Sequence, residues 1–238
     1  YVGWMSIFVV APIIIMVVYA FSTAAGDFTL ENFARMGTYT AVFTRSFKLA
    51  IIATLIALLI GYPVSYMLSK EGPQVQRIAM VLIMLPMWMN FLLRTYSWMS
   101  ILENNGLLNQ LFQQIGLIDL YNQIVLGMVY NYLPFMILPI YSVLVKLDHS
   151  LIEAARDLGA SSVQVFRKVI LPLSLPGVLS GITMVFVPSV STFAISRMLG
   201  GGTELLLGDL IERQFLGGAY NPQLGAAISL VTMVIVLV

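Results

Sequence analysis

The 238-residue chain has no cysteine, a single histidine and few charged side chains. Without cysteine, disulfide scaffolds, thiol catalysis and the usual zinc sites are excluded. Charged residues make up 10% of the chain and hydrophobic residues 59%, whereas about a quarter of a soluble domain is charged. The 12 basic and 11 acidic residues nearly cancel, so no basic surface is available for nucleic acid. These scarcities exclude a water-soluble enzyme and indicate a membrane protein.

The chain contains long apolar runs, and the length of each is near the roughly 20 residues that a helix needs to cross a bilayer. They lie at about 2–21, 47–69, 78–101, 122–145, 173–194 and 223–238. Continuous runs such as AIIATLIALLIG predict helices, because a barrel would show short alternating strands. We expect an all-α integral membrane protein, a polytopic bundle of about six transmembrane helices in a single domain over 1–238. The first run lacks a basic flank, so it is interpreted as a span rather than a signal sequence, and both ends of the chain are interpreted as trimmed.

Lysine and arginine predict the orientation, because they are denser in cytoplasmic loops. The segments 70–77 and 146–169 hold Lys70, Arg77, Lys146, Arg156, Arg167 and Lys168. The opposite loops hold a similar number over more than twice the length, so the first two segments are predicted to be cytoplasmic and the N-terminus inside. The long loop 195–222 is then external. Its acids Glu204, Asp209 and Glu212 could dock an external solute-delivering protein, or the loop could simply be solvated.

The polar cytoplasmic segment 148–172 has the pattern of an amphipathic helix pair. Its predicted apolar side holds Leu151, Ala155, Leu158, Ser162, Val165, Phe166 and Val169. Asp148 or Ser150 can cap its start, Gly159 permits a turn or a close approach, and Pro172 is expected to mark the boundary before the next span. Charges of both signs on the polar side favour a protein partner over anionic lipid.

This segment also carries a motif, in which Glu153-Ala154-Ala155 is followed by Gly159 and then by Val169-Ile170-Leu171-Pro172. The spacing resembles the EAA loop of permease subunits of bacterial ABC importers, with Val169 where isoleucine is usual. The resemblance implies a type I ABC importer permease fold, in which 148–172 is a coupling helix seated in a cleft of a partner ATPase. By the same resemblance, the ATPase-coupling residues are Glu153, Ala154, Ala155, Asp157 and Gly159.

Longer segments, at 61–70, 85–102, 106–119 and 132–161, are similar to the B-type permease subunit of spermidine/putrescine importers. This resemblance implies inward transport of polyamines by alternating access across the bacterial plasma membrane. It also implies a second permease subunit in a heterodimer, two ATPase subunits and an extracytoplasmic polyamine-binding protein. No G-x-x-x-x-G-K-[ST] motif occurs, so ATP and Mg²⁺ are expected on the partner ATPase and no cofactor or enzymatic activity in this chain.

Two alternatives to a polyamine permease remain from the sequence. One is an ABC permease for another small solute, such as iron or thiamine. The other is a secondary transporter driven by an ion gradient, against which stands the lack of Asp or Glu in any predicted span.

A cation path without carboxylates would have to use aromatic rings, carbonyl groups and amides. The candidates are Tyr62, Tyr66, Trp88, Asn90, Tyr96, Trp98, Tyr130, Asn131 and Tyr132. Lipid-interface and packing roles are open alternatives for each. Arg94 lies one turn from Asn90 in the third run and would repel a polyamine, so a structural or gating role is favoured over cargo binding.

Overall fold

The computed structural model describes residues 2–102, 120–199, 205–218 and 220–237. These residues are helical apart from turns, loops and one isolated β-bridge between Ser22 and Phe28. They form two compact units, one from Tyr1–Lys48, Val190–Arg197 and Gly201–Val238, the other from Leu49–Ser189 and Met198–Gly200. The expected all-helical membrane architecture is confirmed.

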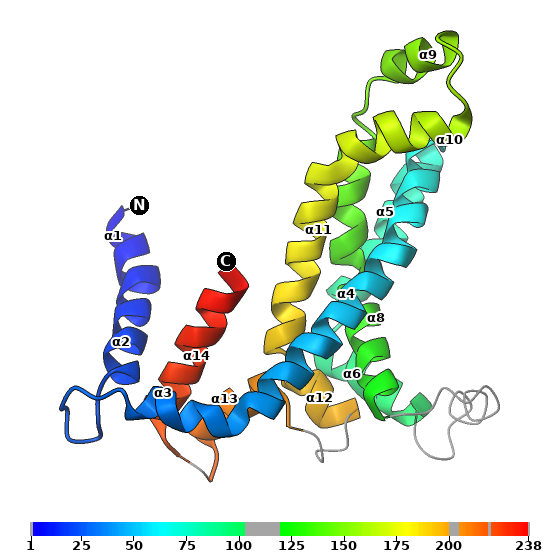
Figure 1. Cartoon of the computed structure of the whole chain (residues 1–238). Coiled ribbons are helices and arrows are strands. Elements are labelled where there is room, and N and C mark those ends of the chain that lie inside the picture. The colour runs from blue at the N-terminus through cyan, green and yellow to red at the C-terminus, as the bar shows by residue number, and fades with distance from the viewer. Residues whose placement is uncertain (1, 103–119, 200–204, 219, 238) are drawn as a thin grey trace. The chain divides into compact units, whose positions relative to one another are not determined.

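The first unit is organised around the contact between the two ends of the chain. Its elements are α1 (Val2–Met5), the π turn η1 (Ser6–Val10), α2 (Ala11–Ala20), α3 (Glu31–Met36), the 3₁₀ turn η2 (Gly37–Tyr39), the start of α4 (Thr40–Ser69), most of α12 (Ala194–Leu199), α13 (Leu207–Leu216) and α14 (Pro222–Leu237). Helix α14 packs against α2, α3 and α13 (Figure 1). Ala20, Ala226 and Ala227 are buried in the contact, because small side chains let membrane helices approach closely.

The second unit is a bundle with α8 at its centre. It holds the rest of α4, α5 (Pro73–Trp88), α6 (Phe91–Leu102), α8 (Leu120–Leu144), α9 (His149–Asp157), α10 (Ser162–Val165), the π turn η3 (Phe166–Ile170) and most of α11 (Leu171–Ser191). Met136 of α8 is fully buried between Gly61 of α4 and Gly181 of α11. A Cβ atom on either glycine would lie within 2.9 Å of the Met136 side chain, so any larger residue would force Met136 to shift.

Four helical runs are long and apolar enough to span a membrane: Gly3–Ala20, Glu31–Ser69, Gln123–Leu144 and Ser162–Ser191. They match the first, second, fourth and fifth predicted spans. The third is not one straight helix, because Pro73–Trp88 and Leu92–Ile101 meet at 91°, and counting this pair as one span gives up to five. The sixth is represented by α14, which has 16 residues.

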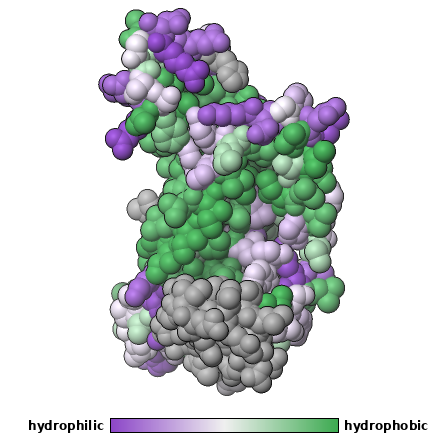
Figure 2. Space-filling model, turned by 90° about the vertical axis from the view of Figure 1, so that its right-hand side faces the viewer, coloured by the Kyte–Doolittle hydropathy of each residue, from purple (hydrophilic) through white to green (hydrophobic). Residues whose placement is uncertain are grey.

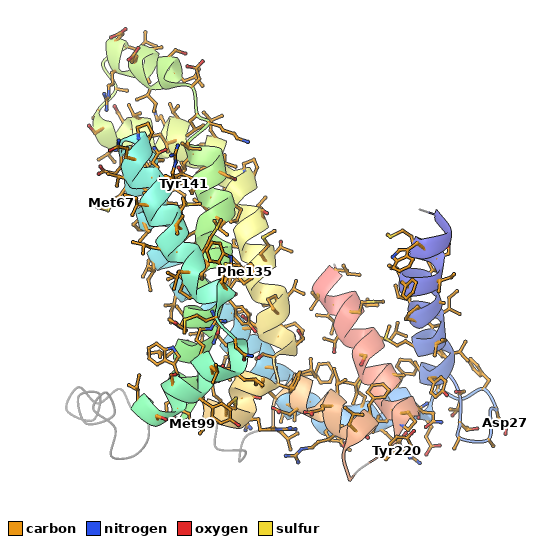
Figure 3. All side chains as sticks on the ribbon, turned by 180° about the vertical axis from the view of Figure 1, so that it is seen from behind. Asp27, Met67, Met99, Phe135, Tyr141 and Tyr220 are labelled. Carbon is orange, nitrogen blue, oxygen red and sulfur yellow. The ribbon has the colours of Figure 1, made fainter. Side chains whose placement is uncertain are left out.

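Both segments predicted to be cytoplasmic lie at the same end of the second unit. The turn from α4 to α5 lies beside α10, and α9 lies beyond them (Figure 1). Hydrophobic surface covers the middle of the face shown in Figure 2, and hydrophilic surface gathers at the α9 end. Met67 and Tyr141 lie toward the α9 end of this unit and Met99 at its opposite end (Figure 3). The shared end agrees with the prediction that both segments lie on the same side of the membrane.

Candidate functional site

The coupling segment folds as a helix, a tight turn and a second helix. Asp148 caps α9, its side chain accepting a hydrogen bond from the backbone N–H of Ser150 at 2.9 Å, so Asp148 rather than Ser150 has the capping role. Gly159 follows α9 with φ of +79°, a conformation that only glycine adopts at little cost. Ser161 and Gln164 then form a capping box that starts α10.

The expected boundary at Pro172 is wrong. The helix continues without interruption over Ser162–Ser191, and Pro172 lies inside α11. The π turn η3 directly precedes it, and the Leu171 N–H bonds to the Phe166 carbonyl five residues earlier. This wider turn relieves the clash between a proline ring and the preceding carbonyl. The coupling segment is therefore joined to the membrane helix by continuous helix.

The face of α9 that packs on the second unit also differs from the prediction. Ile152 and Ala155 pack against the bundle core, together with Phe166 and the buried Val165. Leu158 and Leu151, which were predicted on the apolar side, are 89% and 47% exposed. Adjacent apolar residues at 151 and 152 allow two helix rotations with similar patterns, and only the tertiary contacts choose between them.

The implied docking residues are largely available to a partner. Glu153, Ala154, Asp157 and Gly159 are exposed, and Ala155 is half-buried against the core. The exposed Leu158 adds an apolar side chain to this polar surface. Its exposed position gives a partner protein an apolar contact beside the acidic groups.

The external acids separate into different environments. Glu204 lies outside the described residues. Asp209 is only 4% exposed, so it does not contribute to an acidic surface. Its carboxylate accepts hydrogen bonds from the Ser196 hydroxyl and from the Leu206 N–H. Burial raises the pKa of Asp209 above its usual value, although these hydrogen bonds oppose the rise.

Glu212 differs from Asp209 because it is partly exposed and forms an ion pair. Its Oε2 lies 2.6 Å from Nη2 of Arg197, whose Nε is 4.0 Å from Asp209. Sequence reasoning missed this network, in which Arg197 of α12 joins two acids of α13. The N–H of Leu207 also donates to Ser46 Oγ at 2.8 Å, which ties the start of α13 to α4 within the first unit.

Of the path candidates, the structure brings Trp98 and Tyr130 together with Arg94. The two rings meet edge to face with centroids 5.0 Å apart, and the Arg94 guanidinium lies 5.7 Å from the Tyr130 ring centre. Arg94 is 8% exposed, and its Nη1 donates to the Pro86 carbonyl at 2.6 Å. The guanidinium of Arg94 thus already lies against the Tyr130 ring, which was expected to contact a cationic cargo.

Asn90 is not deep in a straight span, as had been expected, but at the break between α5 and α6. Its Oδ1 accepts a hydrogen bond from the Leu92 N–H at 2.9 Å and so caps α6. Trp88 and Tyr96 are 74% and 52% exposed and lie on the surface of the unit. Within the described part of the chain, Asn90 caps a helix, while Trp88 and Tyr96 lie on the surface.

The remaining candidates lie in or against the core of the second unit. Tyr62 shares a hydrogen bond of 2.9 Å with Ser174, and Tyr66 packs edge to face on Phe166. Tyr132 packs against the same core. Asn131 is 2% exposed; its Nδ2 donates to the Gly127 carbonyl at 2.8 Å, and its Oδ1 has no hydrogen-bond partner among the described residues. Within the same residues, no cluster of three or more His, Asp or Glu could hold a metal ion.

Comparisons with known proteins give the family. Residues 55–238 match the model of the binding-protein-dependent transport system inner membrane component. The chain is 38% identical to the spermidine/putrescine transport system permease protein PotB of Escherichia coli K12, over 99% of this chain and 90% of that protein. It is 37% identical to the protein of that name from Haemophilus influenzae, over 96% and 85%. It is also 27% identical to the inner membrane ABC transporter permease protein YdcU of Escherichia coli K12, over 82% and 68%.

Solved structures support the fold. A bacterial alginate ABC transporter in complex with an alginate-bound periplasmic protein matches with a TM-score of 0.68 and 18% identity, over 99% of this chain and 88% of that one. The MetNI methionine ABC transporter matches with a TM-score of 0.65 and 21% identity, over 86% and 92%. Family membership decides against a stand-alone secondary transporter and against an enzyme. The chain belongs to the binding-protein-dependent transport system inner membrane components: it is a multi-pass inner-membrane permease of an ABC importer, a component that works with an ATPase and a periplasmic binding protein.

Proposed function

We propose that this permease imports polyamines, with spermidine and putrescine as its cargo. The observation that carries the proposal is the 38% identity, over 99% of the chain, to permeases named for these two solutes. The predicted spans contain no Asp or Glu that could bind a cation. They do contain aromatic rings, carbonyl groups and amides, which can hold ammonium groups without neutralising them.

Asn131 is the strongest candidate for a cargo contact. Its amide oxygen is buried and lacks a hydrogen-bond partner among the described residues, an arrangement that costs about 1–3 kcal/mol. An ammonium or imino N–H of the cargo would supply the missing donor when alternating access opens the path.

The proposal includes the partners that complete the transporter. The chain supplies one coupling segment, so two ATPase subunits require a second permease, which we propose to be a different chain in a heterodimer. Glu153, Ala154, Ala155, Asp157 and Gly159 would contact one ATPase, and a polyamine-binding protein would deliver cargo from outside. The exposed positions of four of these five residues support this assignment.

Transport by the reconstituted complex tests the cargo. The permease, its second permease, the ATPase and the binding protein are placed in liposomes, and uptake of labelled spermidine, putrescine, thiamine and ferric iron is measured. We expect ATP-dependent accumulation of the polyamines alone, lost when the ATPase is inactivated. Accumulation of thiamine or iron without polyamine uptake would overturn the cargo assignment and leave the family unaffected.

Replacing Asn131 with leucine tests the cargo contact. Leucine has the same number and branching of side-chain heavy atoms as asparagine and removes the unsatisfied oxygen, so the complex should still assemble and its thermal stability should not fall through a lost hydrogen bond. The KM for spermidine should rise about tenfold, corresponding to the loss of one hydrogen bond to a charged group. Thr54→Val is the matched control, because Thr54 is buried in α4 and its hydroxyl donates within its own helix, to the Ala50 carbonyl. An unchanged KM in Asn131→Leu would remove Asn131 from the path.

A further inference from the structure

A cavity of about 360 Å³ lies beneath α9, where the coupling segment meets the membrane helices. It is formed by the end of α4, the end of α8, the inner side of α9 and the start of the helix that continues into α11. Leu144 and Ile170 give it an apolar floor, and both are almost fully buried. All of these residues belong to the second unit.

Cationic and hydroxyl groups surround this floor. Lys70 and Arg156 line the cavity together with Ser69 and Ser162, and no acidic residue of the described part of the chain lines it. Lys70 is held in place because its Nζ lies 3.9 Å from the centre of the Tyr66 ring, which also lines the cavity. Among the described residues, neither Lys70 nor Arg156 forms an ion pair within 4.0 Å. Two positive charges thus face one cavity without a counter-charge.

The cavity is distinct from the surface assigned to ATPase docking. Ile152 and Arg156 are four residues apart in α9 and share the side that lines the cavity. Glu153 and Asp157 lie on the neighbouring side of the same helix. They are exposed, as Arg156 is, but only Arg156 of the three lines the cavity. A partner that contacts Glu153 and Asp157 would therefore leave the side of α9 with Ile152 and Arg156 facing the cavity.

We propose that this cavity binds a phosphate group, held by Lys70 and Arg156 with Ser162 as a hydroxyl donor. The Ser69 hydroxyl donates to the Tyr66 carbonyl at 2.9 Å and would join only by turning from that carbonyl to the anion. A tetrahedral anion can accept hydrogen bonds from two separated cations and a hydroxyl at once. The position at the cytoplasmic end of the helices gives access both to phospholipid headgroups of the inner leaflet and to free phosphate. Because Lys70 follows α4 and Arg156 belongs to α9, the bound group links the coupling segment to the transmembrane bundle. This inference does not depend on the cargo.

Thermal unfolding of the assembled transporter tests the site. The complex is placed in phosphatidylcholine nanodiscs, and either inorganic phosphate is titrated at constant ionic strength or phosphatidylglycerol is added to the lipid in steps. We expect at least one of these additions to raise the Tm of the wild-type complex. A rise with phosphatidylglycerol alone identifies a lipid headgroup, a rise with phosphate alone identifies a soluble anion, and a rise with both identifies the phosphate group itself.

Charge-matched variants separate this site from general electrostatics. Lys70→Gln/Arg156→Gln should abolish the rise in Tm, and each single change should weaken binding about fivefold. Arg77→Gln/Lys168→Gln removes the same charge from exposed positions that do not line the cavity, and should keep the rise. The Lys70→Arg/Arg156→Lys variant keeps both charges and should also keep the rise in Tm.

If the double glutamine variant does not assemble, the single variants give the same comparison. No rise in the wild type, or an equal rise in the Lys70 and Arg156 variants and the Arg77/Lys168 control, would overturn the proposal.

Discussion

Gly159 joins α9 to α10 in a backbone conformation that other residues adopt at a cost. Its φ is +79°, and a Cβ placed there would meet nothing within 4 Å. Alanine would therefore be strained by its backbone alone, by roughly 1–2 kcal/mol, and asparagine, which tolerates this region better, would be strained less. We expect Gly159→Asn to retain more ATP-driven uptake than Gly159→Ala.

The same pair of variants separates two roles for this glycine. If the partner ATPase needs empty space at residue 159, the larger asparagine would impair uptake more than alanine. Measuring uptake rate and Tm for both variants decides the question, and the order alanine above asparagine would contradict the conformational role. The motif alone could not decide it, because its spacing is compatible with a turn or with a close approach.

Asp209 is predicted to make stability depend on pH. Burial raises its folded-state pKa above the ordinary value of 3.8, so the folded protein binds this proton more tightly than the unfolded chain. The resulting contribution to stability is complete below about pH 3.8 and is lost as the pH rises through the folded-state pKa. The Tm of the wild type minus the Tm of Asp209→Asn should therefore increase as the pH falls from 7 to 4.

Ser196 provides the internal control for this pH dependence. Its hydroxyl bonds the Asp209 carboxylate and lowers the pKa of that group. Without this hydrogen bond the pKa of Asp209 should rise further. The Tm difference between Ser196→Ala and Ser196→Ala/Asp209→Asn should therefore begin to increase at a higher pH than in the presence of Ser196. Parallel Tm curves for wild type and Asp209→Asn across the whole range would contradict the assignment. The sequence placed Asp209 in an external acidic loop because burial by α12 and the Leu206 backbone cannot be inferred from local pattern.

Among the elements, the bend between α5 and α6 depends most clearly on one side chain. The last carbonyls of a helix lack intrahelical donors, and the Pro86 carbonyl near the end of α5 receives one from Arg94 of α6 at 2.6 Å. The positive guanidinium also lies at the negative end of the α5 dipole. Arg94 therefore stabilises the 91° bend between the two helices.

Replacing Arg94 with leucine should destabilise this element without changing cargo choice. A hydrogen bond to a charged group contributes about 1.5–3 kcal/mol, so the Tm of the complex and the uptake rate should both fall. The ratio of spermidine to putrescine uptake should stay constant, and Arg94→Lys, which keeps the charge, should recover part of the loss. A shift of Arg94→Leu toward anionic solutes would instead assign Arg94 to the cargo path.

Sequence pattern predicted the elements better than their contacts. Apolar length located the spans, and the spacing from Glu153 to Pro172 located the coupling segment, since both depend on local periodicity. The break at Asn90 was missed because its neighbours are as apolar as the rest of the run. The rotation of α9 was missed because Leu151 and Ile152 are equally apolar. The cavity beneath α9 was missed because it brings Lys70 and Arg156 together across 86 positions of sequence, a contact that local pattern does not encode.

At the scale of the whole molecule, every functional assignment requires the α9 end of the bundle to be cytoplasmic. The density of lysine and arginine favours this, and the segments 70–77 and 146–169 do lie at one end of the second unit (Figure 1). The absence of cysteine from these 238 residues makes the orientation measurable, because a single introduced thiol is then the only reactive thiol within them.

Single-cysteine variants at exposed positions should label from opposite sides of the membrane. Gln74→Cys and Ser150→Cys should react with a membrane-impermeant maleimide only in inverted vesicles, and Ala24→Cys, in the loop after the first span, only in spheroplasts. Gln74 precedes the coupling segment and provides a reading that ATPase docking on α9 does not obstruct. Labelling of both Gln74→Cys and Ser150→Cys from outside would contradict the orientation, because a segment outside the cell cannot meet an ATPase that hydrolyses cytoplasmic ATP.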